Sequence, residues 1–320
     1  MWWRVLVAAL LAVIAALLFW DRARVAGVLV PGTTPHEAYS RSLVAAGLAD
    51  TALGRDWVAA ADRALRQPES RNPPLEATIT HPASAARAYG YRLELRRGRV
   101  LHTTLQVESA EPALVFIDVF RAEEGGEAEH VVSARKGELT VRHEIRRDGI
   151  YIVRIQPELL RGGALRIAHR TTASLTFPVA GRDAAAVGSR FRDPRDGGRR
   201  EHHGVDIFAP RETAVVAASD GVVTSAGTNR LGGNVVWVWD AARHQSHYYA
   251  HLSRQAVRIG ERVEAGDVIG YVGNTGNARG TPPHLHFGIY ALREGPIDPL
   301  PFVSGDPGVK PGQARTGSGG

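Results

Sequence analysis

Residues 283–287 read Pro-His-Leu-His-Phe, an alternating stretch in which two histidines flank one leucine. Side chains two positions apart on a β-strand point to the same face of the sheet. His284 and His286 are therefore expected to project side by side, so that one can bind a metal ion while the other acts on substrate or bound water. Taken alone, the stretch also fits two coincidental histidines on a solvated strand face.

A second stretch, Arg-Glu-His-His-Gly-Val-Asp at residues 200–206, carries His202 and Asp206 four positions apart. On a strand that breaks at Gly204, both side chains can reach one point. This stretch alone also fits a charged loop that happens to contain histidine.

A third stretch, Tyr-Ala-His at residues 249–251, lies between the other two. With a period of two, His247, Tyr249 and His251 are predicted to share one strand face. A histidine beside a pocket can carry protons near neutral pH. The alternative is an ordinary half-buried strand face.

Together the three stretches predict a catalytic metal site. Two imidazoles and one carboxylate leave one position of a tetrahedral zinc ion open, which distinguishes a catalytic site from a structural one. A zinc ion held in this way lowers the pKa of its water and polarises a carbonyl group. The chain lacks a His-Glu-x-x-His motif, so a histidine is the available base.

Composition narrows the chemistry further. The 320 residues contain no cysteine, which excludes disulfides, thiol catalysis and cysteine-ligated zinc. Seven of the thirteen histidines fall between His202 and His286. The formal net charge of +6 suits a polyanionic partner or reflects an arginine-rich proteome. The sequence has no basic and aromatic run typical of nucleic-acid binding, so no nucleic-acid partner is expected.

The N-terminus carries an apolar run from Val5 to Trp20, with Trp2 and Trp3 before it. Its length approaches the roughly 20 residues that span a bilayer. A cleaved signal peptide would have a shorter apolar core and a small-x-small cleavage site. Residues 1–22 are therefore interpreted as a transmembrane anchor, with a signal sequence as the alternative.

The remaining chain divides by pattern. Residues 35–67 predict short helices, and the prolines within residues 67–74 predict a linker. Alternating apolar residues over 75–176 predict a small antiparallel β-sandwich-like accessory domain. Residues 177–303 predict an all-β domain, and the Gly-, Pro- and Ser-rich residues 304–320 a disordered tail.

The stretch from about 177 to 301 resembles the lysostaphin-type (LytM-like) zinc endopeptidases of bacterial cell walls. The matching motifs stand in the family's order and spacing, namely Arg-x-His-x-Gly-x-Asp at 200–206, Tyr-x-His-Leu-Ser at 249–253, Val-x-x-Gly-x-x-Val-x-x-Gly-x-x-Ile-Gly at 257–270, Gly-Asn-Thr-Gly at 273–276 and Pro-His-Leu-His-Phe at 283–287. The resemblance does not extend to residues 21–176. Two positions depart from the family: Pro282 replaces a glycine, and Gly288 stands where a glutamate often follows.

The resemblance implies that His202, Asp206 and His286 are zinc ligands. It implies that His251 and His284 are the catalytic pair, on a barrel-like antiparallel sheet with a groove for an extended peptide. His203, His244 and His247 lie off the motifs and are not expected to bind metal. The two departures are expected to change the shape of the groove and to leave the chemistry intact.

The leading hypothesis is a zinc metalloendopeptidase that cleaves peptide cross-links of peptidoglycan. It would be anchored in the inner membrane through the N-terminal helix, with its body on the extracytoplasmic side of the cell envelope. The alternative is a non-catalytic regulator of the same fold that activates a cell-wall amidase. A peptidase acting on a secreted protein is a third hypothesis. The cleaved bond and the oligomeric state do not follow from the sequence.

Overall fold

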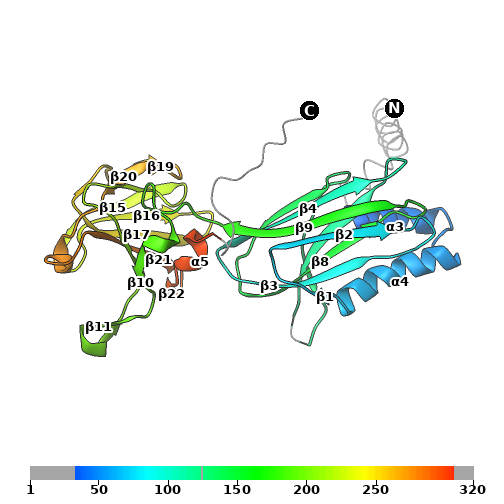
Figure 1. Ribbon diagram of the computed structural model, residues 1–320, viewed down its shortest axis with the longest axis horizontal. Helices are drawn as coiled ribbons and strands as arrows, with labels where there is room; N and C mark the ends of the chain where they lie inside the picture. Colours follow the sequence, from blue (N-terminus) through cyan, green and yellow to red (C-terminus); the bar gives the residue numbers. More distant parts are fainter. Residues whose placement is uncertain (1–32, 124, 306–320) are drawn as a thin grey trace, which may run out of the picture.

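The computed structural model describes residues 33–123 and 125–305, which form two β-sheet lobes lying side by side (Figure 1). The predicted mostly β architecture with antiparallel sheets is confirmed. The expected anchor over residues 1–22 lies outside the described residues, as does all of the expected tail beyond residue 305. Among the described residues, no helix combines the length and apolar character needed to cross a membrane.

The N-terminal lobe contains two sheets that enclose one apolar core. Inward-facing side chains alternate along its strands, as in Tyr91, Leu93 and Leu95, which are at most 4% exposed. The five-stranded sheet has the order β1 (Glu69–Ser70), β3 (Tyr89–Leu95), β8 (Gly149–Pro157), β5 (Val115–Arg121) and β6 (Glu129–Ser133). The four-stranded sheet has the order β2 (Leu75–His81), β9 (Gly163–Ala173), β4 (Arg99–Glu108) and β7 (Thr140–Glu144).

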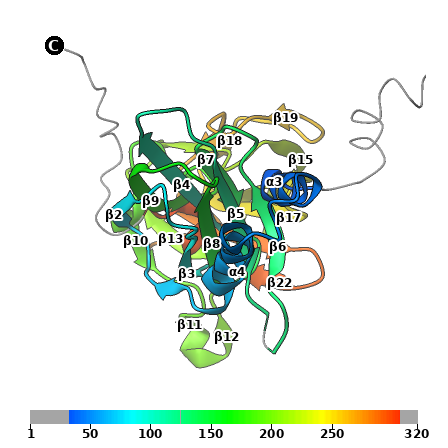
Figure 2. The same ribbon diagram turned by 90° about the vertical axis from the view of Figure 1, so that its right-hand side faces the viewer.

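Two helices, α3 (Pro35–Ala45) and α4 (Ala52–Arg66), pack on this lobe at the end away from the other lobe (Figures 1 and 2). Thr51 caps α4 by accepting a hydrogen bond from the amide of Gly54. The buried side of α4 includes Trp57, which is 1% exposed and donates from Nε1 to the carbonyl oxygen of Pro157. The helices are therefore part of the sandwich lobe.

The proline-rich segment 67–74 is not the free linker that its composition predicts. β1 within it pairs in parallel with β3, and the amide of Arg71 donates to the carbonyl oxygen of Arg92. The side chain of Asn72 accepts from the amide of Glu94. Proline removes backbone donors but leaves this edge pairing possible, and the segment is fixed along the sheet.

The C-terminal lobe contains a large antiparallel sheet and a small one. The large sheet has the order β10 (Val187–Ser189), β13 (Val205–Phe208), β21 (His284–Ala291), β17 (Gln245–Leu252), β16 (Gly233–Asp240), β15 (Gly221–Asn229) and β19 (Arg262–Val263), with β22 (Gly295–Ile297) beside β21. The small sheet has the order β14 (Ala214–Val216), β20 (Val268–Tyr271) and β18 (Arg254–Gln255). A separate hairpin pairs β11 (Pro194–Arg195) with β12 (Arg200–Glu201).

One face of the large sheet packs on the core, and the opposite face carries the polar motifs. Leu285, Phe287 and Ile289 of β21 are fully buried in the core. His284 and His286 alternate with them and so point to the other face, as predicted. Within residues 257–263, strand pairing is limited to β19 at residues 262–263.

The two lobes meet in a joint that includes charged and apolar contacts. Arg243 donates from Nε to Glu144 at 2.7 Å and from a terminal nitrogen to Asp240 at 2.9 Å. Phe302 belongs to the short helix α5 (Leu300–Val303), and its ring lies against Gly98. A Cβ at Gly98 would lie only 2.5 Å from this ring. Through these contacts, β7 and the turn between β3 and β4 pack against the C-terminal lobe.

Candidate metal centre

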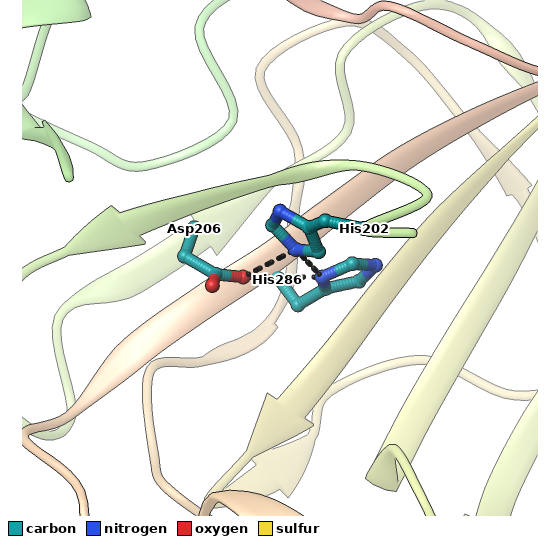
Figure 3. Close-up of side chains that lie close together, drawn as sticks. All are labelled: His202, Asp206 and His286. Carbon is teal, nitrogen blue, oxygen red and sulfur yellow. Dashed lines mark hydrogen bonds and ion pairs between the residues drawn. The ribbon is translucent and has the colours of Figure 1, made fainter. Parts of the chain in front are cut away.

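His202, Asp206 and His286 bring three ligand atoms together, all within 4.8 Å of one another (Figure 3). His202 Nε2 lies 2.8 Å from His286 Nδ1 and 3.0 Å from Asp206 Oδ1, and His286 Nδ1 lies 3.1 Å from the same oxygen. Asp206 and His286 are direct partners in the register of β13 with β21. The convergence predicted from the spacing is therefore present.

A glycine permits this approach of the two segments. A Cβ at Gly204 would lie 2.4 Å from the carbonyl oxygen of Phe287 and 2.8 Å from the ring of His286. Any larger residue would push the turn that carries His202 away from β21. The close contact with β21 thus explains why the Arg-x-His-x-Gly-x-Asp motif has a glycine at position 204.

The donor set fits a divalent cation. His202 Nδ1 lies 2.8 Å from the carbonyl oxygen of Arg190, and because a carbonyl can only accept, Nδ1 must carry the proton. His202 Nε2 therefore presents a lone pair to the centre, where it faces a carboxylate oxygen of Asp206. Two lone-pair atoms so close together favour a shared cation, and two imidazoles with one carboxylate suit zinc.

The protonation states agree with a ligand role. Burial alone would raise the pKa of Asp206, but the neighbouring imidazoles of His202 and His286 outweigh it and hold that pKa well below its ordinary value. Burial lowers the pKa of His286. The carboxyl group is therefore ionised and the His286 ring neutral at pH 7, the forms in which these groups bind metal.

His251 lies beside the three converging residues. Its ring centroid is 5.0 Å from that of His284 and 6.0 Å from that of His286. Its Nδ1 lies 2.9 Å from the carbonyl oxygen of Thr275, which fixes the proton there and leaves Nε2 as the free acceptor. Burial lowers the pKa of His251 to about 4, and the neighbouring histidines add to the effect.

His251 reaches this position by a route that the strand period did not predict. His247 and Tyr249 point into the core and are fully buried, and the Tyr249 hydroxyl accepts from the amide of Ala218. At His251 the backbone has a φ of 62°, and its amide donates to the carbonyl oxygen of Gly232. This left-handed turn ends the alternation, so the predicted shared face of His247, Tyr249 and His251 is wrong.

His284 is held in the same manner as His251. Its Nδ1 lies 2.9 Å from the carbonyl oxygen of Pro282, so its Nε2 is also free. Pro282, one of the two departures from the family pattern, thus orients a site histidine through its backbone. The ring of Phe208 lies 5.2 Å from the His284 ring and is 38% exposed.

A cleft of about 620 Å³ adjoins His284, lined by residues 181–183, 185–186, 208–210 and 282–283. Phe208 belongs both to the wall of this cleft and to the surroundings of His284. On the other side of His286, the Tyr248 ring lies 5.8 Å from the His286 ring, and the Trp237 ring lies tilted against Tyr248 at 4.4 Å. The centre is thus flanked by aromatic side chains on the groove face of the sheet.

Gly288, the second departure, also has a steric reason. A Cβ at this position would lie 2.9 Å from the carbonyl oxygen of His203 and 3.1 Å from the ring of Tyr290. A glutamate at position 288 would require the turn that contains His203, here called the 203 turn, to move. Among the described residues, the converging group does not include His203, His244 or His247.

Arg195 is a site residue that the sequence did not indicate. It donates to Asp206 Oδ2 at 2.7 Å. The spacing of eleven residues carries no periodic signal, because the contact depends on the β11–β12 hairpin folding back beside β13. The Asp-Gly-Gly run at residues 196–198, in the turn of this hairpin, is the local sequence sign of a chain reversal.

An open donor set on an antiparallel sheet defines this lobe as a candidate metallohydrolase domain. Residues 200–299 match the sequence profile of peptidase family M23, and this segment is a domain of that family. The family resemblance stated from the motifs is thereby confirmed.

Individual relatives share this segment. The chain is 39% identical over 138 residues to the L-Ala–D-Glu endopeptidase of Bacillus subtilis (strain 168), covering 40% of this chain and 42% of that protein. It is 42% identical over 112 residues to the peptidoglycan DD-endopeptidase ShyC of Vibrio cholerae, covering 33% and 24% of the two chains. The match therefore spans less than half the length of these curated relatives.

Among solved structures, the catalytic domain of lysostaphin from Staphylococcus simulans is 34% identical. That likeness covers 36% of this chain and 89% of the lysostaphin domain, with a TM-score of 0.33.

Proposed function

We propose that this protein is a zinc-dependent endopeptidase that cleaves peptide cross-links in bacterial peptidoglycan. The observation that carries the proposal is the convergence of His202, Asp206 and His286 within 4.8 Å, with two further histidines beside them. A regulator without catalysis would not need three converging ligand side chains with two further histidine rings beside them.

In this proposal His202, Asp206 and His286 hold the zinc ion. A bound zinc ion with an open position lowers the pKa of a water molecule and polarises the scissile carbonyl. His251 accepts a proton at Nε2, because its Nδ1 is committed to the carbonyl oxygen of Thr275. His284, once protonated, donates from Nε2 to the oxygen that becomes negatively charged, while Pro282 keeps its ring in place.

The substrate proposal is supported by the activities that the relatives' names state and by the site's surroundings. The cleft beside His284 and the aromatic residues beside His286 extend to both sides of the centre, as a groove for an extended peptide requires. The net charge of +6 favours association with an anionic wall polymer.

We further propose that the protein acts in the cell envelope, anchored through the apolar run Val5–Trp20, with its body outside the cytoplasm. The sandwich lobe over 75–176, together with α3 and α4, would govern placement of the catalytic lobe. The contacts of Arg243 and Phe302 at the joint support such a fixed relation.

The test measures release of muropeptides from purified sacculi by the full chain, with and without a metal chelator. Release should require metal, return when zinc is added back, and be lost in His286→Ala. Equal release with and without chelator would overturn the metal mechanism. A chain that purifies without bound metal and releases nothing would instead favour the amidase-activating regulator.

A further inference from the structure

The segment of residues 189–195, here called the 189–195 loop, contacts two of the converging residues, His202 and Asp206. The carbonyl oxygen of Arg190 accepts from His202 Nδ1 at 2.8 Å. The amide of Arg192 donates to the carbonyl oxygen of His202, and the amide of His202 donates to the carbonyl oxygen of Asp193. These contacts fix the backbone and ring orientation of His202.

Arg195 makes the corresponding contact with the second ligand candidate. One terminal nitrogen of its guanidinium donates to Asp206 Oδ2 at 2.7 Å and to Ser189 Oγ at 2.5 Å. Asp206 meanwhile directs Oδ1 towards His202 and His286. The two oxygens of one carboxylate are therefore divided between the guanidinium and the centre.

Burial makes this ion pair more than a surface contact. The Asp206 side chain is 13% exposed and that of Arg195 is 29% exposed. Ser189 is itself held, because its hydroxyl donates to Asp193 Oδ2 at 3.0 Å, and that oxygen also accepts from the amide of Arg190 at 2.7 Å. One hydrogen-bonded network therefore supports Asp206, and it runs through Asp193, Ser189 and Arg195.

We propose that Arg195 is a positioning residue of the metal centre: it holds Asp206 Oδ2 so that Oδ1 alone is directed at the cation. The inference rests on the proposed function, since it assumes that the centre binds metal. Partners that orient ligating groups are worth about 10- to 100-fold in metal affinity or activity.

The geometry requires a guanidinium and not just a positive charge. Arg195 spans Ser189 and Asp206 from a planar group whose orientation is fixed by both acceptors. A lysine at this position carries the same charge as a point donor on a flexible stem. Arg195→Lys should therefore restore part of the effect of the arginine.

The experiment measures zinc affinity of the full chain by competition with a chromophoric chelator. It compares Arg195→Ala, Arg195→Lys and the control Arg192→Ala. Arg192 lies on the same loop, is 71% exposed and has a distant ion pair with Glu201 at 3.6 Å, so its removal changes net charge equally. We expect about a 10- to 100-fold loss for Arg195→Ala, a smaller loss for Arg195→Lys, and a change of less than about 2-fold for the control.

A second readout separates positioning from general destabilisation. The absorption spectrum of the cobalt-substituted protein should change in Arg195→Ala and remain that of the wild type in Arg192→Ala, because it reports the ligand arrangement. Thermal unfolding of the metal-free variants tests whether they fold. If Arg195→Ala does not fold, Arg195→Lys decides the question with the same two readouts.

The inference is overturned if a folded Arg195 variant binds zinc as tightly as the Arg192→Ala control with an unchanged cobalt spectrum. It is also overturned if both loop variants lose affinity equally, since net charge would then be the cause. A wild-type chain that binds no zinc would overturn the proposed function itself, and the two failures are therefore distinguishable.

Discussion

At the scale of single residues, His251 tests the division between metal binding and proton transfer. His251→Ala should retain zinc and lower kcat by about 10²-fold or more, because it removes a proton acceptor without removing a ligand. Bound zinc and muropeptide turnover are measured on the same preparation. His203→Ala is the control, since His203 is exposed and lies outside the converging group. Loss of zinc in His251→Ala would show that its role has been assigned wrongly.

The sequence allowed much of this site to be predicted because its chemistry is encoded in short spacings. His284 and His286 are two apart on a strand, and His202 and Asp206 stand on either side of the glycine that lets the turn approach β21. The contact of Arg195 could not be predicted, because it depends on the path of a hairpin. Metal binding by these residues stays a prediction, whereas their convergence is confirmed.

At the scale of elements, Gly288 tests how closely β21 must approach the 203 turn. In Gly288→Ala the added Cβ would meet the carbonyl oxygen of His203 at 2.9 Å, so the strand or the turn must shift. We expect a loss of about 1–3 kcal/mol in the free energy of unfolding, measured with urea, and slower turnover.

The control for this substitution is Gly227→Ala on β15. A Cβ at Gly227 meets no atom within 4 Å, and glycine has no positive φ there. Its unfolding free energy should stay the same or rise slightly, because alanine restricts the unfolded chain. Equal destabilisation of both variants would show that the close approach at Gly288 is not the cause.

Element by element, the alternating strands were predictable and the short ones were not. Strands such as β16 and β21 have a clear period of two, because one face is buried. β10, β11 and β12 have two or three residues each, too few for any period. A free linker was predicted for residues 67–74 because proline content is typical of loops. The structure differs because β1 pairs with β3, a strand distant in sequence.

At the scale of the whole molecule, the joint between the lobes depends on Glu144 and Arg243. Their side chains are 20% and 19% exposed, and the guanidinium makes two hydrogen bonds to the carboxylate. Glu144→Ala should lower the unfolding free energy by about 1–3 kcal/mol and separate the calorimetric transitions of the lobes.

The matched control is Glu138→Ala. Glu138 is paired with Arg135 across 3.8 Å at the surface, where both side chains are at least 50% exposed. Such pairs contribute little to stability. If Glu144→Ala and Glu138→Ala unfold alike, the lobes are not coupled through this contact.

Acid should destabilise the sandwich lobe through His169. This ring is fully buried, its Nδ1 pairs with the Thr103 hydroxyl at 2.9 Å, and burial lowers its pKa to about 4. Since the unfolded ring has a pKa near 6.5, the unfolded state gains a proton first as the pH falls. The stability is complete above about pH 6.5 and falls by about 3 kcal/mol towards pH 4.

This pH dependence is measured as the free energy of unfolding in urea between pH 7 and 4. His169→Gln should reduce the slope in that window, because it removes one of the buried histidines whose pKa is lowered by burial. His130→Gln, at an exposed position, should leave the slope unchanged. A wild-type curve no steeper than that of His169→Gln would contradict the prediction.

The left-handed backbone at His251 has a practical consequence for capturing a substrate complex. Asparagine adopts this conformation more readily than other residues with a side chain, and its short amide leaves no ring nitrogen for proton transfer. His251→Asn should therefore give a protein whose turn stays in register but whose turnover stalls. Crystals of that variant soaked with a cross-linked fragment would hold the uncleaved peptide in place and show directly which bond is presented for hydrolysis.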